Sequence, residues 1–287
     1  MRFGFITCVQ LGLSCIEELE ALGREGTAGD LVYLGTLHDD QSVKKSGRIY
    51  LDDVGARTGV PVTKFRHVND ADAVGSIKAA DLDWLYIIGW SQIAGPDVLT
   101  ATRNGVIGMH PTLLPVGRGR ASVPWAIIKG LDETGVSMFQ LDEGVDTGPL
   151  LGQVRIPITP TETSTTLYDK VAAAHRTLIR EVHPPLARGE ITPAPQDHSL
   201  ATEWPGRTPA DGELHPDTMT VAKIERMVRA LTRPYPGAFV TQDEQTVRIW
   251  AGSAAAPSVG QPSYPVHAVD GTYWATDYEV EVVGAEA

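Results

Sequence analysis

Two stretches near the middle of the chain read Gly108-Met109-His110-Pro111-Thr112-Leu113-Leu114-Pro115 and Leu141-Asp142-Glu143-Gly144-Val145-Asp146-Thr147-Gly148. In each, one titratable side chain, His110 or Asp146, stands in a Gly- or Pro-rich turn after an apolar, strand-like run. Ligands of open α/β sheets bind at the carboxyl ends of the strands, so we expect both side chains to face one crevice. A histidine and a carboxylate that converge there form a proton-transfer pair. Either residue alone would suit a surface or capping role, but two such turns favour a functional site.

The segments around these stretches alternate between strand-like and helix-like patterns. Strands are predicted over 2–9, 30–37, 83–88 and 106–109, and helices over 11–22, 122–130 and 165–187. Such alternation predicts a Rossmann-like α/β fold with a mainly parallel sheet and helices on both faces. Nicotinamide and flavin binding are disfavoured, because Cys8-Val9-Gln10-Leu11-Gly12 has one glycine where the dinucleotide fingerprint has three.

The last third of the chain has a different pattern. Residues 189–212 are polar and rich in proline, which predicts a linker. A helix is predicted to end before Pro234, and short strand-like runs follow over 237–240, 246–250, 265–269 and 272–276. We therefore expect a catalytic domain over 1–188, a linker over 189–212 and a small, mostly β, OB-like subdomain over 213–287.

Composition limits the class of protein and of partner. A chain of 287 residues, 42% hydrophobic and 21% charged, is typical of globular proteins and can bury an ample core. No run of about 20 apolar residues predicts a membrane span, and no signal-peptide pattern is seen, so we expect a cytoplasmic protein without a membrane partner. The net charge of −12 disfavours nucleic acid as a partner and favours a small substrate.

Cysteine and histidine usage argues against disulfide and metal chemistry. Cys8 and Cys15 are expected to be buried, reduced thiols in a protein without a secretory signal. No Cys/His cluster has the spacing of a tetrahedral metal site, so no metal is predicted.

The paired motif resembles the signature of the formyltransferase family, which moves a formyl group from 10-formyltetrahydrofolate to an amine. The matching stretches are His110-Pro111-Thr112-Leu113-Leu114-Pro115 and Asp146-Thr147-Gly148, with Arg118-Gly119 and residues 126–135 also in register. Farther on, Arg207-Thr208-Pro209 and the run from Arg229 to Phe239 resemble family members that act on nucleotide-linked amino sugars.

The resemblance implies a one-carbon transferase (EC 2.1.2.-) with 10-formyltetrahydrofolate as co-substrate and a nucleotide-linked amino sugar as acceptor. Formyl transfer to another small amine, such as an amino acid or a natural-product intermediate, or to initiator methionyl-tRNA, stays open as an alternative. A protein that binds folate or a sugar nucleotide without full activity is the non-enzymatic alternative. A homodimer is also left open.

The family pattern further implies roles for individual residues. His110 would accept and donate the proton that is transferred. Asp146 would orient the ring of His110 and stabilise its cation, or would take the amine proton directly. Trp90 would either stack on the pterin or pack against its own loop. The positions expected to contact folate are Ile88, Gly89, Trp90, Gln92, Ile93, Leu141, Asp142, Glu143, Gly144 and Val145.

Gly108 departs from the family pattern, which has an asparagine two residues before the histidine. That asparagine is taken to donate a hydrogen bond to the formyl oxygen, and loss of one such donor typically lowers the rate by roughly a hundred- to a thousandfold. We therefore expect Gly108 to belong to the catalytic centre, with a backbone amide, a water or His110 as the donor; altered chemistry is the alternative.

Arg118 and Arg120 flank Gly119 in the loop that follows the histidine motif. A forked guanidinium there could bind a diphosphate with two hydrogen bonds, whereas the alternative is a solvated loop. Thr112, the hydroxyl residue of the motif, is predicted as a further substrate contact.

Overall fold

The computed structural model describes residues 1–41, 47–242 and 245–282. It divides into two compact units, and three separate segments of the chain build the first of them: Met1–Arg118, Gly135–Ile156 and Val171–Glu203. The second unit takes Gly119–Thr134, Pro157–Lys170 and the chain from Trp204 onward. The sequence predicted a simpler, linear order of domain, linker and subdomain.

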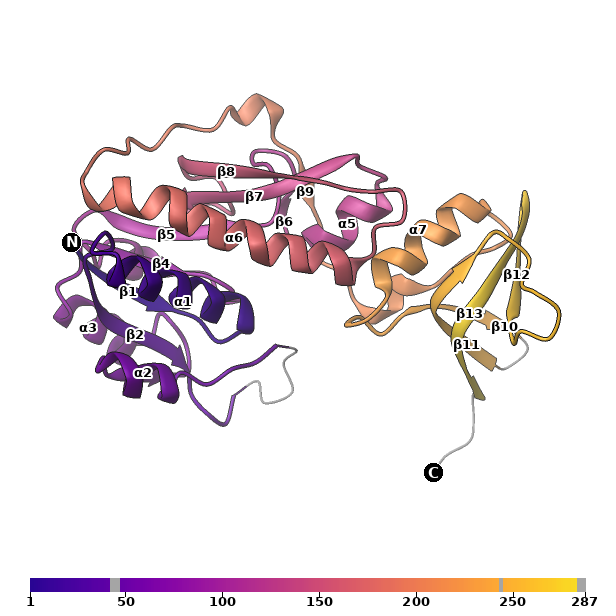
Figure 1. Ribbon diagram of the computed structural model, residues 1–287, viewed down its shortest axis with the longest axis horizontal. Coiled ribbons are helices and arrows are strands. Elements are labelled where there is room, and N and C mark those ends of the chain that lie inside the picture. The colour runs from indigo at the N-terminus through magenta and orange to yellow at the C-terminus, as the bar shows by residue number, and fades with distance from the viewer. Residues whose placement is uncertain (42–46, 243–244, 283–287) are drawn as a thin grey trace. The chain divides into compact units, whose positions relative to one another are not determined.

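A seven-stranded sheet forms the first unit (Figure 1), in the order β3-β2-β1-β4-β5-β7-β8. The pairs among the first five of these strands are parallel, and β7 runs antiparallel to β5. The predicted mainly parallel sheet is therefore confirmed. The strands are β1 Arg2–Ile6, β2 Asp30–Leu37, β3 Val62–Phe65, β4 Trp84–Ile87, β5 Gly105–His110, β7 Glu133–Gln140 and β8 Leu150–Pro157.

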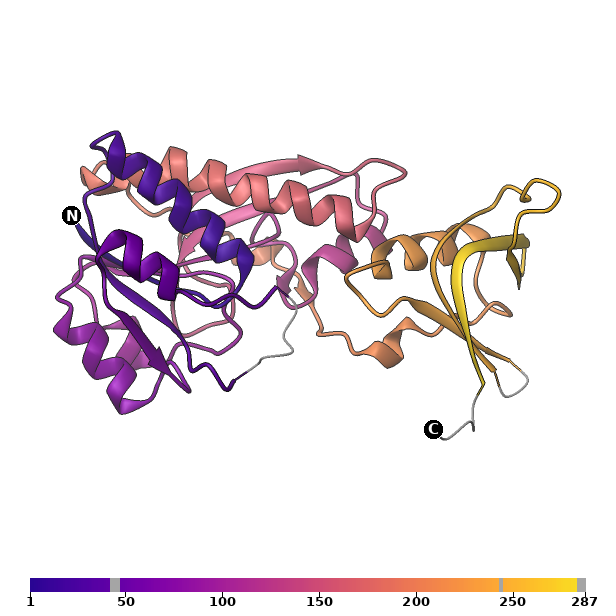
Figure 2. The ribbon, with the colours of Figure 1, turned by 60° about the horizontal axis from the view of Figure 1, so that its bottom comes forward.

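Helices cover both faces of this sheet because its strands are apolar on both sides. Along β4, Leu85 and Ile87 belong to a buried cluster with residues of α3 and α4, whereas Tyr86 donates or accepts a hydrogen bond with His183 of α6. Helices α1 and α6 lie side by side (Figure 2), joined by Arg180 and Glu18. The helices are α1 Gln10–Arg24, α2 Asp52–Thr58, α3 Ala71–Ala79, α4 Pro96–Leu99 and α6 Ser164–Ala187.

A helix and an antiparallel sheet characterise the second unit. In α7 (Val221–Leu231), Thr220 accepts a hydrogen bond from the backbone N–H of Lys223 at the helix start, and an apolar stripe faces inward. The four strands β10 Ala238–Gln242, β11 Gln245–Ser253, β12 Tyr264–Ala268 and β13 Gly271–Val282 pair in the order β10-β11-β13-β12. Helix α5 (Ser122–Ile128) contacts α7. The predicted mostly β C-terminal region is confirmed.

The segment predicted as a linker is tied into the structure. Ala194 exchanges two backbone hydrogen bonds with Leu150, and Gln196 is buried. Three short elements follow in this segment: η1 His198–Leu200, β9 Glu203–Trp204, which pairs with β6 Arg118–Gly119, and η2 Pro209–Gly212. The sequence predicted a linker here, and the structure shows tertiary hydrogen bonds, which leave no local pattern in the sequence, holding the segment.

Candidate active site

His110 is the last residue of β5 and is buried. Its Nε2 lies 2.8 Å from the carbonyl oxygen of Gly117. Because a carbonyl can only accept, Nε2 must carry the hydrogen and donate it. The other ring nitrogen, Nδ1, lies 3.4 Å from Oδ2 of Asp146. The structure thus brings together the two residues that the sequence singled out.

The Gly117 contact determines how this pair can hold protons. A neutral His110 with its hydrogen on Nε2 presents a lone pair at Nδ1, and an ionised Asp146 presents another at Oδ2. The two atoms attract each other only when one additional proton sits on either of them. The pair can therefore accept one proton from a neighbouring group and return it, which is the work of a general acid–base pair.

Asp146 reaches His110 by a route that the sequence did not indicate. Strand β7 runs antiparallel to β5, so its end at Gln140 lies opposite Ile107, and the backbone N–H of Leu141 bonds to Val106. We had expected both side chains to follow the carboxyl ends of strands at one edge of the sheet. Because β7 is antiparallel to β5, the carboxyl ends of these two strands lie at opposite edges. Instead, the turn over residues 142–148 carries Asp146 back toward the end of β5.

Local contacts stabilise this turn. Oδ1 of Asp142 accepts hydrogen bonds from the backbone N–H of Gly144 at 3.1 Å and the hydroxyl of Thr147 at 2.6 Å. A Cβ atom at Gly148 would lie 1.8 Å from the carbonyl oxygen of Gln140, so only glycine fits there. Asp146 itself has a φ of +54°, in the left-handed region that residues other than glycine rarely adopt. Such strain needs support from the surrounding structure.

Gln196 supplies support that the sequence analysis missed. Its Nε2 donates to the carbonyl oxygens of Asp146 and Gly148, at 2.9 and 2.7 Å. Its Oε1 accepts from Nη2 of Arg118 at 2.7 Å. A glutamine in a proline-rich stretch gives no signal of this role, since only the fold brings residues 118, 146 and 196 together.

The predicted substrate contacts Arg118, Arg120 and Thr112 differ in placement. Arg118 is 6% exposed. Its Nη2 donates hydrogen bonds to Oε1 of Gln196 and to Nδ1 of His198, which lies 3.0 Å away. Nη2 is thus committed to these two partners, and the predicted binding of a diphosphate by Arg118 stays a prediction. Thr112 is buried and its hydroxyl has no hydrogen-bond partner. Arg120 is exposed in the second unit, so its predicted role stays a prediction.

Gly108 lies two residues before His110 on β5, so a side chain there would project from the same face of the sheet. Leu141 occupies that space: a Cβ atom at position 108 would lie 2.6 Å from its Cδ2. No side-chain donor replaces the asparagine of the family pattern at this position. An asparagine would fit only if the flexible end of Leu141 moved aside.

The residues predicted to contact folate lie on two loops, after β4 and after β7. Trp90 packs against Phe65, with ring centroids 5.6 Å apart, and its indole nitrogen is buried without a hydrogen-bond partner. Both polar atoms of the Gln92 side chain bond to the backbone, at Val68 and Arg66. Ile88 is buried, and Gly89 has a φ of +66°.

Two apolar side chains on these loops stand out into solvent, Ile93 at 74% and Val145 at 56% exposure. Their exposure, together with the orphaned indole N–H of Trp90, suits a ligand that has an apolar ring system and hydrogen-bond acceptors. Asp142, Glu143 and Gly144 are exposed beside Val145. Trp90 packs on Phe65 of β3, and its contact with folate stays a prediction.

A second histidine of the first unit, His175, lies within electrostatic range of His110. Burial lowers the pKa of His175 to about 4, and its Nδ1 lies 2.8 Å from the carbonyl oxygen of Val171. Because this carbonyl only accepts, Nδ1 donates. His175 therefore stays neutral near pH 7 and adds no charge beside His110.

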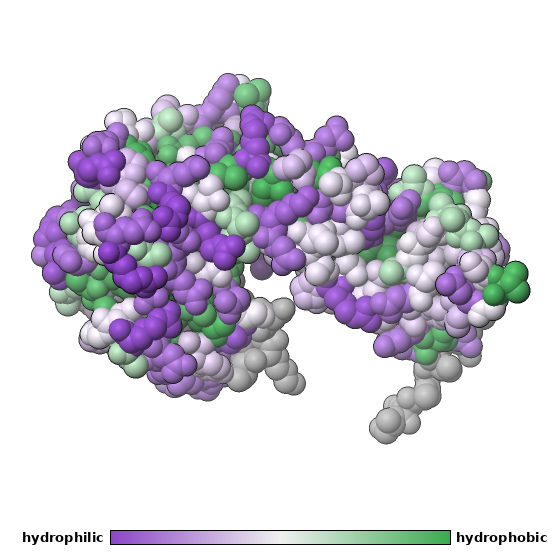
Figure 3. Space-filling view, viewed as in Figure 1, coloured by the Kyte–Doolittle hydropathy of each residue, from purple (hydrophilic) through white to green (hydrophobic). Residues whose placement is uncertain are grey.

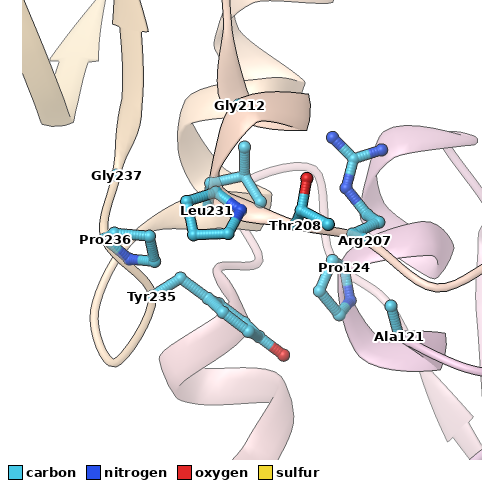
Figure 4. A pocket seen from close by; sticks show the side chains of 10 residues that line it. Ala121, Pro124, Arg207, Thr208, Gly212, Leu231, Tyr235, Pro236 and Gly237 are labelled. Carbon is cyan, nitrogen blue, oxygen red and sulfur yellow. The ribbon is translucent and has the colours of Figure 1, made fainter.

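The second unit holds a cavity of about 210 Å³ (Figure 4). Tyr235 lies on one side of it and Pro124 on the other in this view, and the hydroxyl of Tyr235 bonds to that of Tyr168 at 2.6 Å. Arg207 stacks over the ring of Trp125 at 4.7 Å, and burial lowers the pKa of its guanidinium. The remaining lining residues are Ala121, Thr208, Pro209, Gly212, Leu231, Pro236 and Gly237.

Among the described residues, no three His, Cys, Asp or Glu side chains are grouped as metal ligands would be. No helix in the described ranges has the length and apolarity needed to cross a membrane, and Figure 3 shows apolar side chains scattered among hydrophilic ones on the face in view. Cys8 and Cys15 are both buried and neither is in a disulfide, and burial raises the pKa of Cys15 to about 12.

Comparison with known proteins gives two family matches. The formyl transferase family matches residues 40–182, and the formyl transferase C-terminal domain matches residues 207–284. Together the two matches span well over half of the chain, and the first includes both halves of the paired motif.

Solved structures of formyltransferases share the fold. A methionyl-tRNA formyltransferase from Clostridium thermocellum is 18% identical, with a TM-score of 0.61, over 98% of this chain and 99% of that one. A sugar N-formyltransferase from Shewanella is 18% identical, with a TM-score of 0.71, over 90% and 99%. An N-formyltransferase from Helicobacter canadensis, in complex with folinic acid and dTDP-3-aminofucose, is 14% identical, with a TM-score of 0.72, over 96% and 99%.

Proposed function

Because the chain belongs to the formyltransferase family, we propose that this enzyme transfers a formyl group from 10-formyltetrahydrofolate to the amine of a nucleotide-linked amino sugar. The observation that carries the proposal is the His110–Asp146 pair, whose geometry lets it hold one proton. Formyl transfer requires such a group, because the attacking amine must lose a proton and the departing folate nitrogen must gain one.

When bound, 10-formyltetrahydrofolate supplies the formyl group. The residues that fit it are on the two loops beside His110, where Trp90 offers an orphaned N–H and Ile93 and Val145 offer exposed apolar surface. His110 and Asp146 take the proton that the amine loses as its bond to the formyl carbon forms. They return it to the folate nitrogen as the bond from that nitrogen to the formyl carbon breaks. The Gly117 carbonyl keeps the ring of His110 oriented through both transfers.

The acceptor is proposed from charge and resemblance. A net charge of −12 gives little electrostatic attraction for the many phosphates of a tRNA. Two of the structural relatives are described as N-formyltransferases of sugars or hold a nucleotide-linked amino sugar, and the mainly apolar cavity of the second unit suits a small ligand with a flat ring. Formylation of initiator methionyl-tRNA is the second candidate, because another relative is a methionyl-tRNA formyltransferase.

An acceptor panel tests the proposal. The enzyme would be incubated with 10-formyltetrahydrofolate and, separately, dTDP- and UDP-linked amino sugars, free amino acids and charged initiator tRNA, and formylated products measured by mass spectrometry. We expect turnover only with a nucleotide-linked amino sugar. Efficient, strongly salt-dependent formylation of the tRNA would overturn the choice of acceptor. Binding of folate and sugar nucleotide without turnover of any acceptor would instead favour the non-enzymatic alternative.

A further inference from the structure

We infer that Gln196 and Arg118 are positioning residues that set the distance between Asp146 and His110, an inference that rests on the proposed role of this pair. The four residues, with Gly117 and Gly148, all belong to the first unit. Gln196 and Arg118 are each 6% exposed, so both form their bonds away from solvent.

Gln196 holds the turn that carries Asp146. Its two amide hydrogens go to the carbonyl oxygens of Asp146 and Gly148, which flank Thr147. Asp146 has a strained, left-handed backbone, and rotation of the neighbouring peptide would relieve that strain. Two hydrogen bonds on the peptide oxygens oppose such a rotation. Gln196 thereby keeps the carboxylate of Asp146 in range of His110.

Arg118 fixes which way the Gln196 amide faces. A glutamine amide can rotate and exchange its oxygen and nitrogen, and in the wrong orientation its oxygen would oppose the two carbonyls. A guanidinium can only donate, so Arg118 selects the orientation in which the Gln196 oxygen faces it, at 2.7 Å. For the same reason Nδ1 of His198, 3.0 Å from the same guanidinium nitrogen, must be the acceptor.

The same short segment also holds His110. Gly117, next to Arg118, accepts the Nε2 hydrogen of His110 through its carbonyl oxygen. Thr202 fixes the segment, because its hydroxyl accepts from the N–H of Gly117 and its carbonyl from the N–H of Arg118, both at 2.9 Å. One member of the pair is therefore held through residue 117 and the other through residue 118. This arrangement explains why an arginine in this loop is buried.

A double-mutant cycle tests the inference. Turnover would be measured for wild type, Gln196→Ala, Asp146→Asn and the double variant, with the accepted amine as substrate. We expect Gln196→Ala to lower kcat by roughly ten- to a hundredfold with little change in KM for 10-formyltetrahydrofolate, because small misplacements of a reacting group are costly. In the Asp146→Asn background, the same substitution should add almost no further loss.

Controls separate positioning from general destabilisation. Gln153 is the matched control, since its amide also donates to two acceptors of the first unit, Leu114 and Ser137, without touching the Asp146 turn. Gln153→Ala should keep kcat close to wild type. Gln196→Glu should be at least as damaging as Gln196→Ala, because a carboxylate would face the two carbonyls with acceptors only.

Each outcome has a separate meaning. Equal losses from Gln196→Ala in both backgrounds, or unchanged kcat in Gln196→Ala, would overturn the positioning role. Near-wild-type activity in Asp146→Asn would instead overturn the proposed role of the pair. Should Gln196→Ala unfold, Arg118→Lys is measured in the same cycle, and it too must lose its effect when Asp146 is replaced.

Discussion

His110 ends a strand of the sheet, whereas Asp146 belongs to a turn, and different kinds of contact hold the two. The backbone ladder of β5 and β7 places His110, and one main-chain carbonyl then orients its ring. Asp146 has no strand beneath it, and side-chain hydrogen bonds from Asp142 and Gln196 hold its turn. The position of His110 is therefore determined by secondary structure, and the position of Asp146 by tertiary contacts.

Replacing the carboxylate of Asp146, which lies in the turn, is expected to have the largest effect on activity. Asp146→Asn removes the second proton acceptor of the pair without changing its size, and we expect a loss in kcat of about a hundred- to ten-thousandfold. The measurement is steady-state formyl transfer, with thermal unfolding to verify the fold. Asp97→Asn, at an exposed carboxylate of α4, is the control and should leave kcat unchanged. A loss of less than tenfold in Asp146→Asn would contradict the assignment.

The buried histidines of α6 make stability depend on pH. Burial lowers the pKa of His175 and His183 to about 4, below the usual value of 6.5 that they regain on unfolding. The unfolded chain therefore binds protons that the folded chain refuses, so stability is complete above about pH 6.5 and falls as the pH drops toward about 4. We expect each residue to contribute on the order of 1–3 kcal/mol to this fall, seen in urea denaturation at several pH values.

Replacing both histidines with glutamine should flatten that dependence. The denaturation measurements also define the pH range in which the protein is folded. Within that range, a change in kcat with pH is not caused by acid unfolding. An equally steep dependence in the double variant would mean that other groups cause it.

Gly148→Ala breaks the turn itself. The added methyl group would meet the Gln140 carbonyl oxygen, a backbone atom that cannot rotate away. We expect the free energy of unfolding to fall by about 1–3 kcal/mol, with a loss of kcat. Gly75→Ala in α3 is the matched control, since nothing lies within 4 Å of its Cβ position and alanine favours helix. Unchanged stability in Gly148→Ala would show that the turn is not tightly constrained.

On the strand side, Gly108→Asn should have the smallest effect. The new side chain must displace Cδ2 of Leu141, and we expect this overpacking to lower the free energy of unfolding by about 1 kcal/mol and kcat/KM by no more than roughly tenfold. Leu141→Ala in the same chain makes room, so the double variant should recover at least wild-type activity. A rise in kcat/KM for Gly108→Asn alone would show that Leu141 yields freely.

The same contrast explains what the sequence could predict. Strands, helices and the position of His110 follow from apolar periodicity and turn residues, which are local. The direction of β7, the burial of Arg118 and the role of Gln196 depend on contacts between residues distant in the chain. Polarity and proline content made residues 189–212 look like a linker, although Gln196 within them is buried against the Asp146 turn.

We infer that His110 and Asp146 share one proton on the Nδ1 side, with Nε2 committed to Gly117. Nitrogen-15 NMR of the labelled His110 ring, assigned with His110→Ala, tests it directly. We predict that Nε2 carries the hydrogen in the folded protein and that the Nδ1 signal, which reports the contact with Asp146, changes in Asp146→Asn. A ring that carries its hydrogen on Nδ1, with signals that do not respond to Asp146→Asn, would contradict this arrangement.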